Sequence, residues 1–238
     1  MKTMKNLILT GVLIVSIGTM LTAASNGYNE SVEMKKAEKT LNKAADAFEN
    51  IMDDPDSRIP QSLIDQSEGI VIFPGAFKVA LGTWGGQAGR GVAMIRHDDG
   101  TWSNPFFVNL GEGSVGFQIA AQSTEMVLLF KHSYDVIEID EAEIILGGDI
   151  GIAVGPRGNA VSSDTDIKFD REIYSYTRSK GLYAGVSLAG GVLSYNELVN
   201  GSVYGEYGAE ADDIFDATEI VLYDEVNELI NTLNMYSE

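Results

Sequence analysis

Cysteine is absent from this sequence of 238 residues, and histidine occurs only at His97 and His132. Without cysteine the chain has neither a disulfide nor a lipobox for lipid attachment, so its stability must come from an ordinary hydrophobic core. Two histidines without a thiolate are too few for a structural zinc site, and we expect no metal and no other cofactor. The composition therefore excludes the small scaffolds that disulfides or zinc hold together.

Positive charge is scarce, because 16 Lys and Arg residues stand against 35 Asp and Glu residues, a formal net charge of −19. No basic residue follows Lys180, and residues 181–238 contain eleven acidic ones. Proteins that bind nucleic acids need a cationic surface to displace counterions, so that class of function is excluded. The acidic C-terminal region has two interpretations, a solvated face that favours solubility or a surface that binds a protein partner.

Long apolar runs are also scarce, and the longest extends from Leu7 to Leu21, after Lys2 and Lys5 and before a group of small residues. This order is typical of an export signal. The run is shorter than the roughly 20 residues that a membrane-spanning helix needs, so a retained anchor is only the alternative. We expect residues 1–24 to be a signal peptide and the protein to reach the periplasm or the cell exterior, with membrane association there as an open alternative. The mature chain then has 14 basic and 35 acidic residues, a net charge of −21.

Helical periodicity marks both ends of the mature chain. Apolar residues recur every three or four positions over residues 30–52, which predicts an amphipathic helix with its lysines off the apolar stripe. A short helix is expected from Pro60 to Gly69. After residue 200 the helical period returns, and the capping-box spacing of Asp216 and Glu219 predicts where the last helix begins.

Between these helices the chain is a series of short apolar runs separated by glycine, rich in Val, Ile, Phe and Tyr. Asp99-Gly100 is typical of a hairpin with a type I′ turn, and residues 134–142 fit either a helix or a strand. So many closely spaced strands predict an α+β fold, mostly β, with antiparallel strands in a curled sheet like a barrel or sandwich, flanked by an N-terminal amphipathic helix and a C-terminal helix. The expected strands are 69–73, 77–84, 90–96, 101–108, 114–121, 125–130, 144–154, 158–163, 171–178, 181–188 and 191–195.

Three weak motifs are interpreted as structural. The stretch Gly185-Val-Ser187-Leu-Ala-Gly190 lacks the second glycine of a nucleophile elbow, so a lipid-ester hydrolase is the least favoured function. The glycine-rich residues 85–91 lack the Lys-Ser/Thr ending of a phosphate-binding loop and are expected to form a sharp turn. A third motif, Asp164, Asp166 and Asp170, does not match the spacing of an EF-hand and is expected to be a polar turn.

Five motifs occur in order along the chain: Gly69-Ile-Val-Ile-Phe-Pro74, Gly86-Gln-Ala-Gly-Arg-Gly91, Trp102-Ser-Asn-Pro105, Gly113-Ser-Val-Gly-Phe-Gln-Ile119 and Tyr176-Thr-Arg-Ser-Lys-Gly-Leu-Tyr-Ala-Gly-Val-Ser-Leu188. In this order and spacing they resemble the SYLF family of lipid-binding domains. The resemblance covers roughly residues 35–217, so we expect such a domain over residues 25–217 and a C-terminal helix, residues 218–238, packed on it. The chain departs from the family in its strong acidity, in having no SH3 domain, and in extending about one helix past the usual end.

The resemblance implies a non-enzymatic module that binds membrane lipids, with phosphoinositides as the ligands of eukaryotic members. Some yeast members also bind actin, while the bacterial members are mostly exported and have no well-defined role. The lysines of the first helix and the pair Arg178 and Lys180 are the implied contacts. The full set of candidate lipid-binding residues adds the other basic positions: Lys35, Lys36, Lys39, Lys43, Arg90, Lys168, Arg171, Arg178 and Lys180.

Two functions therefore follow from the sequence. The first is an exported module that binds anionic phospholipid headgroups or a membrane surface, through lysines beside an apolar helix face that either lies in the headgroup layer or packs on the sheet. The second is an envelope scaffold that binds a protein partner through the acidic C-terminal region. The hydrolase at Ser187 is a distant third, and no catalytic residue is expected.

Overall fold

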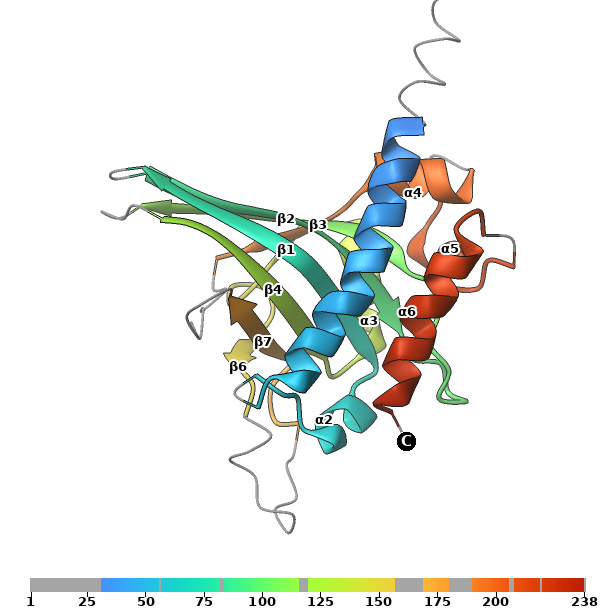
Figure 1. Ribbon diagram of the computed structural model, residues 1–238, viewed down its shortest axis with the longest axis horizontal. Coiled ribbons are helices and arrows are strands. Elements are labelled where there is room, and N and C mark those ends of the chain that lie inside the picture. The colour runs from blue at the N-terminus through green and yellow to red at the C-terminus, as the bar shows by residue number, and fades with distance from the viewer. Residues whose placement is uncertain are drawn as a thin grey trace, which may run out of the picture.

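A curled sheet forms the centre of the computed structural model, and helices cover both of its faces (Figure 1). The structure describes residues 31–55, 57–81, 84–115, 120–156, 169–179, 190–205, 208–218 and 220–237.

Eight strands form this sheet within the described residues, in the order β5-β8-β3-β2-β1-β4-β7-β6. Neighbouring strands are antiparallel, except that β6 runs parallel to β7. The two outer strands of this order do not pair, so the sheet is an open half-barrel. The predicted fold class, α+β with a curled sheet between an N-terminal and a C-terminal helix, is confirmed. The strands are β1 (Gly69–Leu81), β2 (Trp84–Ile95), β3 (Phe106–Val115), β4 (Ala120–Phe130), β5 (Ile144–Ile145), β6 (Ile152–Val154), β7 (Ile173–Ser179) and β8 (Val192–Tyr195).

Side chains that point alternately to the two faces of the sheet give the molecule two hydrophobic cores, one on each face. In β1, Ile70 and Ile72 belong to one core, whereas Val71 and Phe73 belong to the other. Successive side chains of a strand point to opposite faces, so a continuous apolar run is what a strand covered on both faces requires.

The first face is covered by the N-terminal helix, described over residues 31–53, together with α2 (Gln61–Gln66), α4 (Glu197–Tyr204) and α6 (Tyr223–Met235). Leu41 and Phe48 of the N-terminal helix and Leu229 of α6 are fully buried in this core. Figure 1 shows the N-terminal helix crossing this face beside α6. The predicted helix over residues 30–52 and the short helix after Pro60 are therefore confirmed.

The second face is covered by α3 (Ser133–Glu141) and α5 (Ala211–Phe215). Val136 and Ile139 of α3 and Phe215 of α5 are buried there. The ambiguous residues 134–142 are thus helical, with apolar positions spaced by three. The sequence did not indicate α4, whose eight residues are too few for a clear period; Asn196 caps it by accepting a hydrogen bond from the amide of Val199.

Several predicted boundaries are wrong. The strand expected over 144–154 is two short strands, because a loop turns the chain at Gly147, whose φ is 77°. Asp216 does not begin the last helix but ends α5, and α6 begins at Tyr223 after Leu222. β3 begins at Phe106 rather than at residue 101, and β4 extends from Ala120 without the predicted break. The strands expected over 158–163 and 181–188 lie outside the described residues.

The glycine-rich residues 85–91 lie inside β2, so the predicted sharp turn is wrong. A Cβ atom at Gly91 would lie 2.4 Å from the carbonyl oxygen of Ile72 on β1 and 2.6 Å from the ring of Phe73. Glycine serves here to let β1 and β2 approach closely beside a buried ring, which is one of its uses in strand interiors.

The turn at Asp99-Gly100 is present but is not of type I′. A type I′ turn needs positive φ at both central residues, and only Gly100 has it, at 87°. The Asp99 carboxylate accepts hydrogen bonds from both the amide and the hydroxyl group of Thr101, which stabilise the turn with Asp99 in an ordinary conformation.

Candidate functional site

Three exposed lysines, Lys35, Lys39 and Lys43, follow one another at intervals of four residues along the N-terminal helix. Residues four apart lie on the same face of a helix, so these side chains form one row, which we call the lysine row. The fourth predicted lysine, Lys36, is only partly exposed, and its ammonium group lies 2.5 Å from the carboxylate of Glu33. The lysine row is therefore the exposed basic feature of this helix.

The opposite side of the same helix is fixed in the core. Ala37, Leu41 and Phe48 are all fully buried against the sheet and α6. Of the two interpretations of this apolar stripe, the structure therefore shows packing on the sheet. The folded protein thus has no exposed apolar stripe over the described residues 31–53 of this helix to insert into a membrane.

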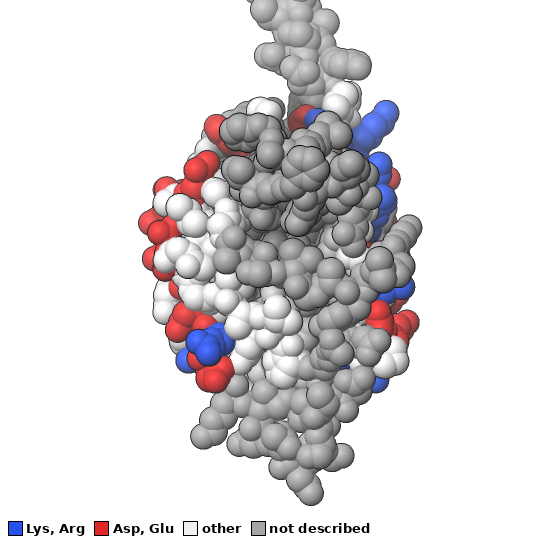
Figure 2. Space-filling view, turned by 90° about the vertical axis from the view of Figure 1, so that its left-hand side faces the viewer, with Lys and Arg blue, Asp and Glu red and all other residues white. Residues whose placement is uncertain are grey.

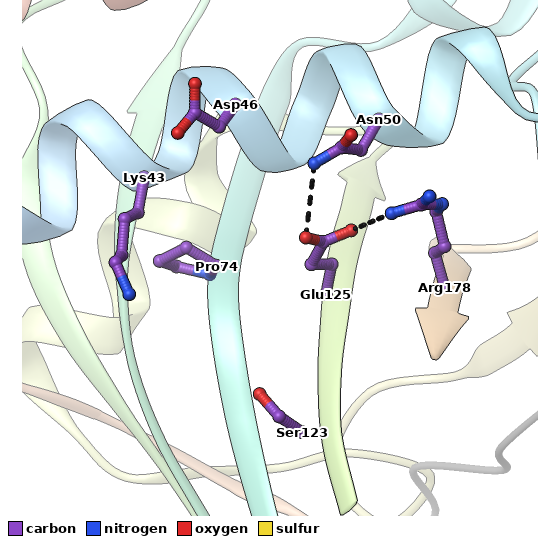
Figure 3. Close-up of a pocket in the computed structure, with 7 residues that line it drawn as sticks. All are labelled: Lys43, Asp46, Asn50, Pro74, Ser123, Glu125 and Arg178. Carbon is purple, nitrogen blue, oxygen red and sulfur yellow. Dashed lines mark hydrogen bonds and ion pairs between the residues drawn. The ribbon is translucent and has the colours of Figure 1, made fainter. Parts of the chain in front are cut away.

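A cavity of about 480 Å³ lies next to the lysine row, between the helix and the strands beneath it (Figure 3). The helix contributes Lys43, and β4 and β7 contribute Glu125 and Arg178. Glu125 is two residues from buried Val127 in β4, and Arg178 is two residues from buried Tyr176 in β7. Side chains two residues apart in a strand point to the same face of the sheet, so Glu125 and Arg178 point toward the helix. The lining residues are Lys43, Asp46, Asn50, Pro74, Ser123, Glu125 and Arg178.

The guanidinium group of Arg178 is paired with two carboxylates. Its Nη1 donates a hydrogen bond of 2.9 Å to Oε2 of Glu125, and its Nε lies 3.6 Å from Oδ2 of Asp54. Glu125 also accepts a hydrogen bond of 3.2 Å from the amide of Asn50. These contacts join the helix to β4 and β7, so Arg178 has a structural role and is a compensated charge.

Lys43 and Asp46 border the same cavity as exposed ions. No ion pair or hydrogen bond of either side chain occurs with another described residue. The hydroxyl group of Ser123, also exposed, lies on the strand side of the cavity (Figure 3). The cavity thus offers an uncompensated cation, an uncompensated anion and a hydroxyl group.

The remaining predicted contacts are not gathered at this cavity. Arg90 is a partly exposed residue of β2, and its Nε is buried and has no hydrogen-bond partner within the described residues. Arg171 is exposed and lies 4.0 Å from Asp170. Lys168 and Lys180 lie outside the described residues. The structure brings together Lys43 and Arg178 at the cavity, and neither Arg90 nor Arg171 is among its lining residues.

The second face of the molecule is acidic. Two cavities of about 330 Å³ each lie beside α3, and carboxylates line both of them. Asp135 is buried there with its Oδ2 unpaired among the described residues, and burial, followed by the charge of Glu172, raises its pKa to about 6. Figure 2 shows acidic side chains along the left of the described surface and basic ones at the upper right.

Neither a metal site nor a membrane-spanning helix occurs in the described part of the chain. No group of three or more His, Cys, Asp or Glu residues there is placed to hold a metal ion, and none of its helices is long and apolar enough to cross a membrane. Asp170 of the predicted polar turn accepts a hydrogen bond from the hydroxyl group of Tyr174. Asp164, Asp166 and Ser187 lie outside the described residues.

Sequence reasoning missed five lining residues of the cavity: Asp46, Asn50, Pro74, Ser123 and Glu125. The first two follow Lys43 by three and seven positions, a spacing that places them on the same side of the helix and that the sequence shows. Glu125 carries no such signal, because it lies 75 residues from its partner Asn50 and 53 from Arg178.

Comparison with known proteins decides the family. A family model named Ysc84 and described as "Las17-binding protein actin regulator" matches residues 111–236, more than half of the chain. The chain belongs to the Ysc84 (SYLF) family. The resemblance seen in the five sequence motifs is thereby confirmed.

The Ysc84 family includes larger proteins similar to this chain. SH3 domain-containing YSC84-like protein 1 of Xenopus laevis is 29% identical over 185 residues, which are 77% of this chain and 54% of that protein. An SH3 domain-containing protein of Schizosaccharomyces pombe is 34% identical over 175 residues, 72% of this chain and 40% of that protein. LAS seventeen-binding protein 3 of Saccharomyces cerevisiae is 29% identical over 177 residues, 73% of this chain and 38% of that protein. The chain spans about half the length of these relatives or less.

Proposed function

We propose that this protein is a non-enzymatic module that binds the surface of a membrane containing anionic lipids, through Lys35, Lys39 and Lys43. One observation carries the proposal: the three exposed lysines stand in a row on a helix whose other side is fixed in the core. The row is therefore presented rigidly, and binding needs no rearrangement of the helix.

The expected strength follows from the number of lysines. A basic residue near an anionic membrane surface contributes about 1 kcal/mol, so the row supplies about 3 kcal/mol, or a factor of about 100 in the partition coefficient, at low salt. This attraction falls with ionic strength, because surface charges are screened over about 8 Å at physiological salt. The protein is thus a weak and salt-sensitive membrane binder.

The distribution of charge supports a single orientation at the membrane. The lysine row lies on the helix of the first face, while the acidic residues around α3 cover the second face. An anionic membrane attracts the lysine row and repels the carboxylates around α3, so the net charge of −21 that remains without residues 1–24 disfavours contact through the second face.

Vesicle co-sedimentation tests this function. Residues 25–238 contain every described element and are mixed with vesicles of phosphatidylcholine with and without 30% phosphatidylglycerol, a test composition. We expect the protein to pellet only with the anionic vesicles at low salt. The triple variant K35Q/K39Q/K43Q should lose most of this binding.

The matched control is K35R/K39R/K43R, which keeps the charge at the same positions and should keep the binding. Thermal unfolding of both variants checks that the helix still packs. If wild-type protein pellets with no vesicle at low salt, or if the glutamine variant pellets as well as the arginine variant, the proposed function is wrong.

We also propose that the protein acts after export, with residues 1–24 as its signal peptide. The support is the order of basic, apolar and small residues in this segment. Expression of the full chain in a bacterial host, followed by fractionation and N-terminal sequencing, should give a product that begins near Ser25 in the exported fraction. Recovery of the intact chain in the cytosol would contradict export.

Protein binding is the second candidate function, favoured by the description of the family as a Las17-binding protein actin regulator. For this chain we propose an acidic surface at the C-terminal region as the contact. Deletion of residues 181–238 would not test it, because Leu229 and Leu233 of α6 are fully buried in the core. Charge reversal of exposed Asp212, Asp213 and Asp224 leaves the core intact. A partner recovered by wild-type protein and lost with this variant would support the second function.

A further inference from the structure

The cavity beside the lysine row carries both signs of charge in equal number. Lys43 and Arg178 contribute two positive charges, and Asp46 and Glu125 contribute two negative charges. A site built for a simple anion would present a positive excess, which this one lacks. Its volume of about 480 Å³ lies within the usual range of small-ligand pockets.

The existing contacts show which charges are available to a ligand. Arg178 is held by Glu125 at 2.9 Å and by Asp54 at 3.6 Å, so an anion that approaches it competes with two carboxylates. Lys43 has no partner among the described residues, and its side chain extends along the cavity past Pro74 (Figure 3). An anionic group would therefore bind at Lys43 rather than at Arg178.

The carboxylates of the cavity provide acceptors for a cationic group. Asp46 is exposed and accepts no hydrogen bond from the described residues. Glu125 is satisfied by one hydrogen bond at each oxygen, but an ionised carboxylate has about four acceptor positions and can take more donors. Both carboxylates line the cavity, so an ammonium group bound there would find acceptors for its three N–H donors.

We propose that this cavity binds a headgroup of the phosphoethanolamine type, in which a primary ammonium group is joined by a short linker to a phosphate. The phosphate binds Lys43 and the hydroxyl group of Ser123, and the ammonium group binds Asp46 and Glu125. The inference rests on the proposed function and makes it more specific: the lysine row provides attraction to any anionic surface, whereas the cavity selects one lipid.

The lining also discriminates between headgroups. A quaternary ammonium such as that of phosphocholine has no N–H to donate to a carboxylate, and proteins bind it with aromatic rings. None of the seven lining residues is aromatic. Phosphocholine should therefore bind much more weakly than phosphoethanolamine.

Soluble headgroups test the chemistry directly. Residues 25–238 are titrated with O-phosphoethanolamine, phosphocholine, ethanolamine and inorganic phosphate, while amide and side-chain NMR signals of the cavity are followed. We expect saturable binding of O-phosphoethanolamine at least tenfold tighter than that of the other three. Equal affinity for phosphocholine or for inorganic phosphate would overturn the inference.

A matched pair of variants locates the site. Asp46→Asn removes the uncompensated carboxylate of the cavity, and we expect affinity for O-phosphoethanolamine to fall at least tenfold. Asp53→Asn removes an exposed carboxylate of the same helix that does not line the cavity, and should change nothing. Both variants keep the core residues of the helix, so a loss of binding in both, or in neither, overturns the assignment.

Binding to vesicles distinguishes this inference from the proposed function. It also distinguishes a lipid headgroup from a free phosphoamine as the ligand. Vesicles with 30% phosphatidylglycerol are prepared with either phosphatidylcholine or phosphatidylethanolamine as the remaining lipid. Stronger binding to the second kind, lost in Asp46→Asn, supports a lipid headgroup as the ligand. Equal binding to both kinds leaves the proposed function standing and overturns the lipid selectivity. Binding of soluble O-phosphoethanolamine without any vesicle binding supports the cavity chemistry but overturns the membrane function.

Discussion

Arg178 and Glu125 are direct neighbours across β7 and β4, and the guanidinium Nη1 donates a hydrogen bond of 2.9 Å to the carboxylate Oε2. Both side chains lie on the face of the sheet that the N-terminal helix covers, where Asn50 and Asp54 of that helix region complete the network. Arg178, which the family resemblance implies as a lipid contact, thus connects the sheet to the N-terminal helix region.

A double-mutant cycle should measure the interaction between Arg178 and Glu125. We expect Arg178→Met and Glu125→Gln each to lower the free energy of unfolding, and the double variant to lower it by less than their sum, with a coupling of about 1 kcal/mol. The pair is only partly exposed, so solvent screens it less than a surface pair. Urea unfolding followed by circular dichroism gives the four values. Additive losses would show that the two side chains do not stabilise each other.

Gly91 should be intolerant of any side chain. Gly91→Ala places a Cβ atom 2.4 Å from the carbonyl oxygen of Ile72, which forces β1 and β2 apart. We expect a loss of about 2–3 kcal/mol in the free energy of unfolding, the upper part of the range for overpacking of a tight interior. Gly111→Ala in β3 is the matched control, since its Cβ would meet no atom within 4 Å. Similar unfolding midpoints for the two variants would contradict the close approach of β1 and β2.

Asn200 of α4 should be important for stability. Its side chain is fully buried, with Oδ1 accepting from the amide of Phe107 at 2.7 Å and Nδ2 donating to the carbonyl oxygen of Phe107 at 3.0 Å. Asn200→Ala leaves the Phe107 amide buried and unpaired, which costs about 2 kcal/mol. Asn200→Asp should be worse, because it also buries a charge. Partly exposed Asn227→Ala is the control, and an equal effect there in urea unfolding would refute the role of Asn200.

Asp135 should make stability depend on pH in an unusual direction. Burial, together with Glu172, raises its pKa to about 6 in the folded state, above the value of about 3.9 in an unfolded chain. The folded state therefore holds the proton more tightly, and stability from this group is present below about pH 4 and is lost as the pH rises through 6. Compared with wild type, Asp135→Asn should raise the free energy of unfolding by about 1 kcal/mol at pH 7.5 and leave it unchanged at pH 4.

Thermal unfolding of the two proteins between pH 4 and pH 8 measures this difference. Neighbouring charges contribute as well, since His132 lowers the pKa of Asp135 and Glu138 and Glu68 raise it. Exposed Glu138→Gln is the control and should give a smaller change with the same sign. A gain for Asp135→Asn that is independent of pH would show that its carboxyl group does not titrate in this range.

Local sequence patterns were sufficient to predict the elements whose apolar residues recur with a clear period. The helix over residues 31–53 could be predicted because Leu41, Phe48 and their neighbours recur at helical spacing, and α2 because Pro60 precedes it. The glycines of residues 85–91 misled the prediction, since a glycine needed for close packing looks in the sequence like a glycine needed for a turn. Asp216 misled it for a similar reason, because a capping residue occurs at either end of a helix.

The candidate site was predictable only in part. The lysine row is visible in the sequence, because Lys35, Lys39 and Lys43 are spaced by four within an amphipathic helix. The state of Arg178 was not visible, since whether a basic residue is free or paired depends on strands that meet at a distance of 53 residues.

The periodicities, the family, the scarcity of positive charge and the row of lysines on one helix can all be recognised from the amino-acid sequence. These properties are encoded within a few neighbouring residues. The tertiary structure decided that the apolar side of the helix packs on the sheet, that Glu125 and Asp54 compensate Arg178, and that Lys43 and Asp46 border one cavity with Glu125. The register between distant strands and the packing of a helix across them fix these pairings, and a one-dimensional pattern does not contain either.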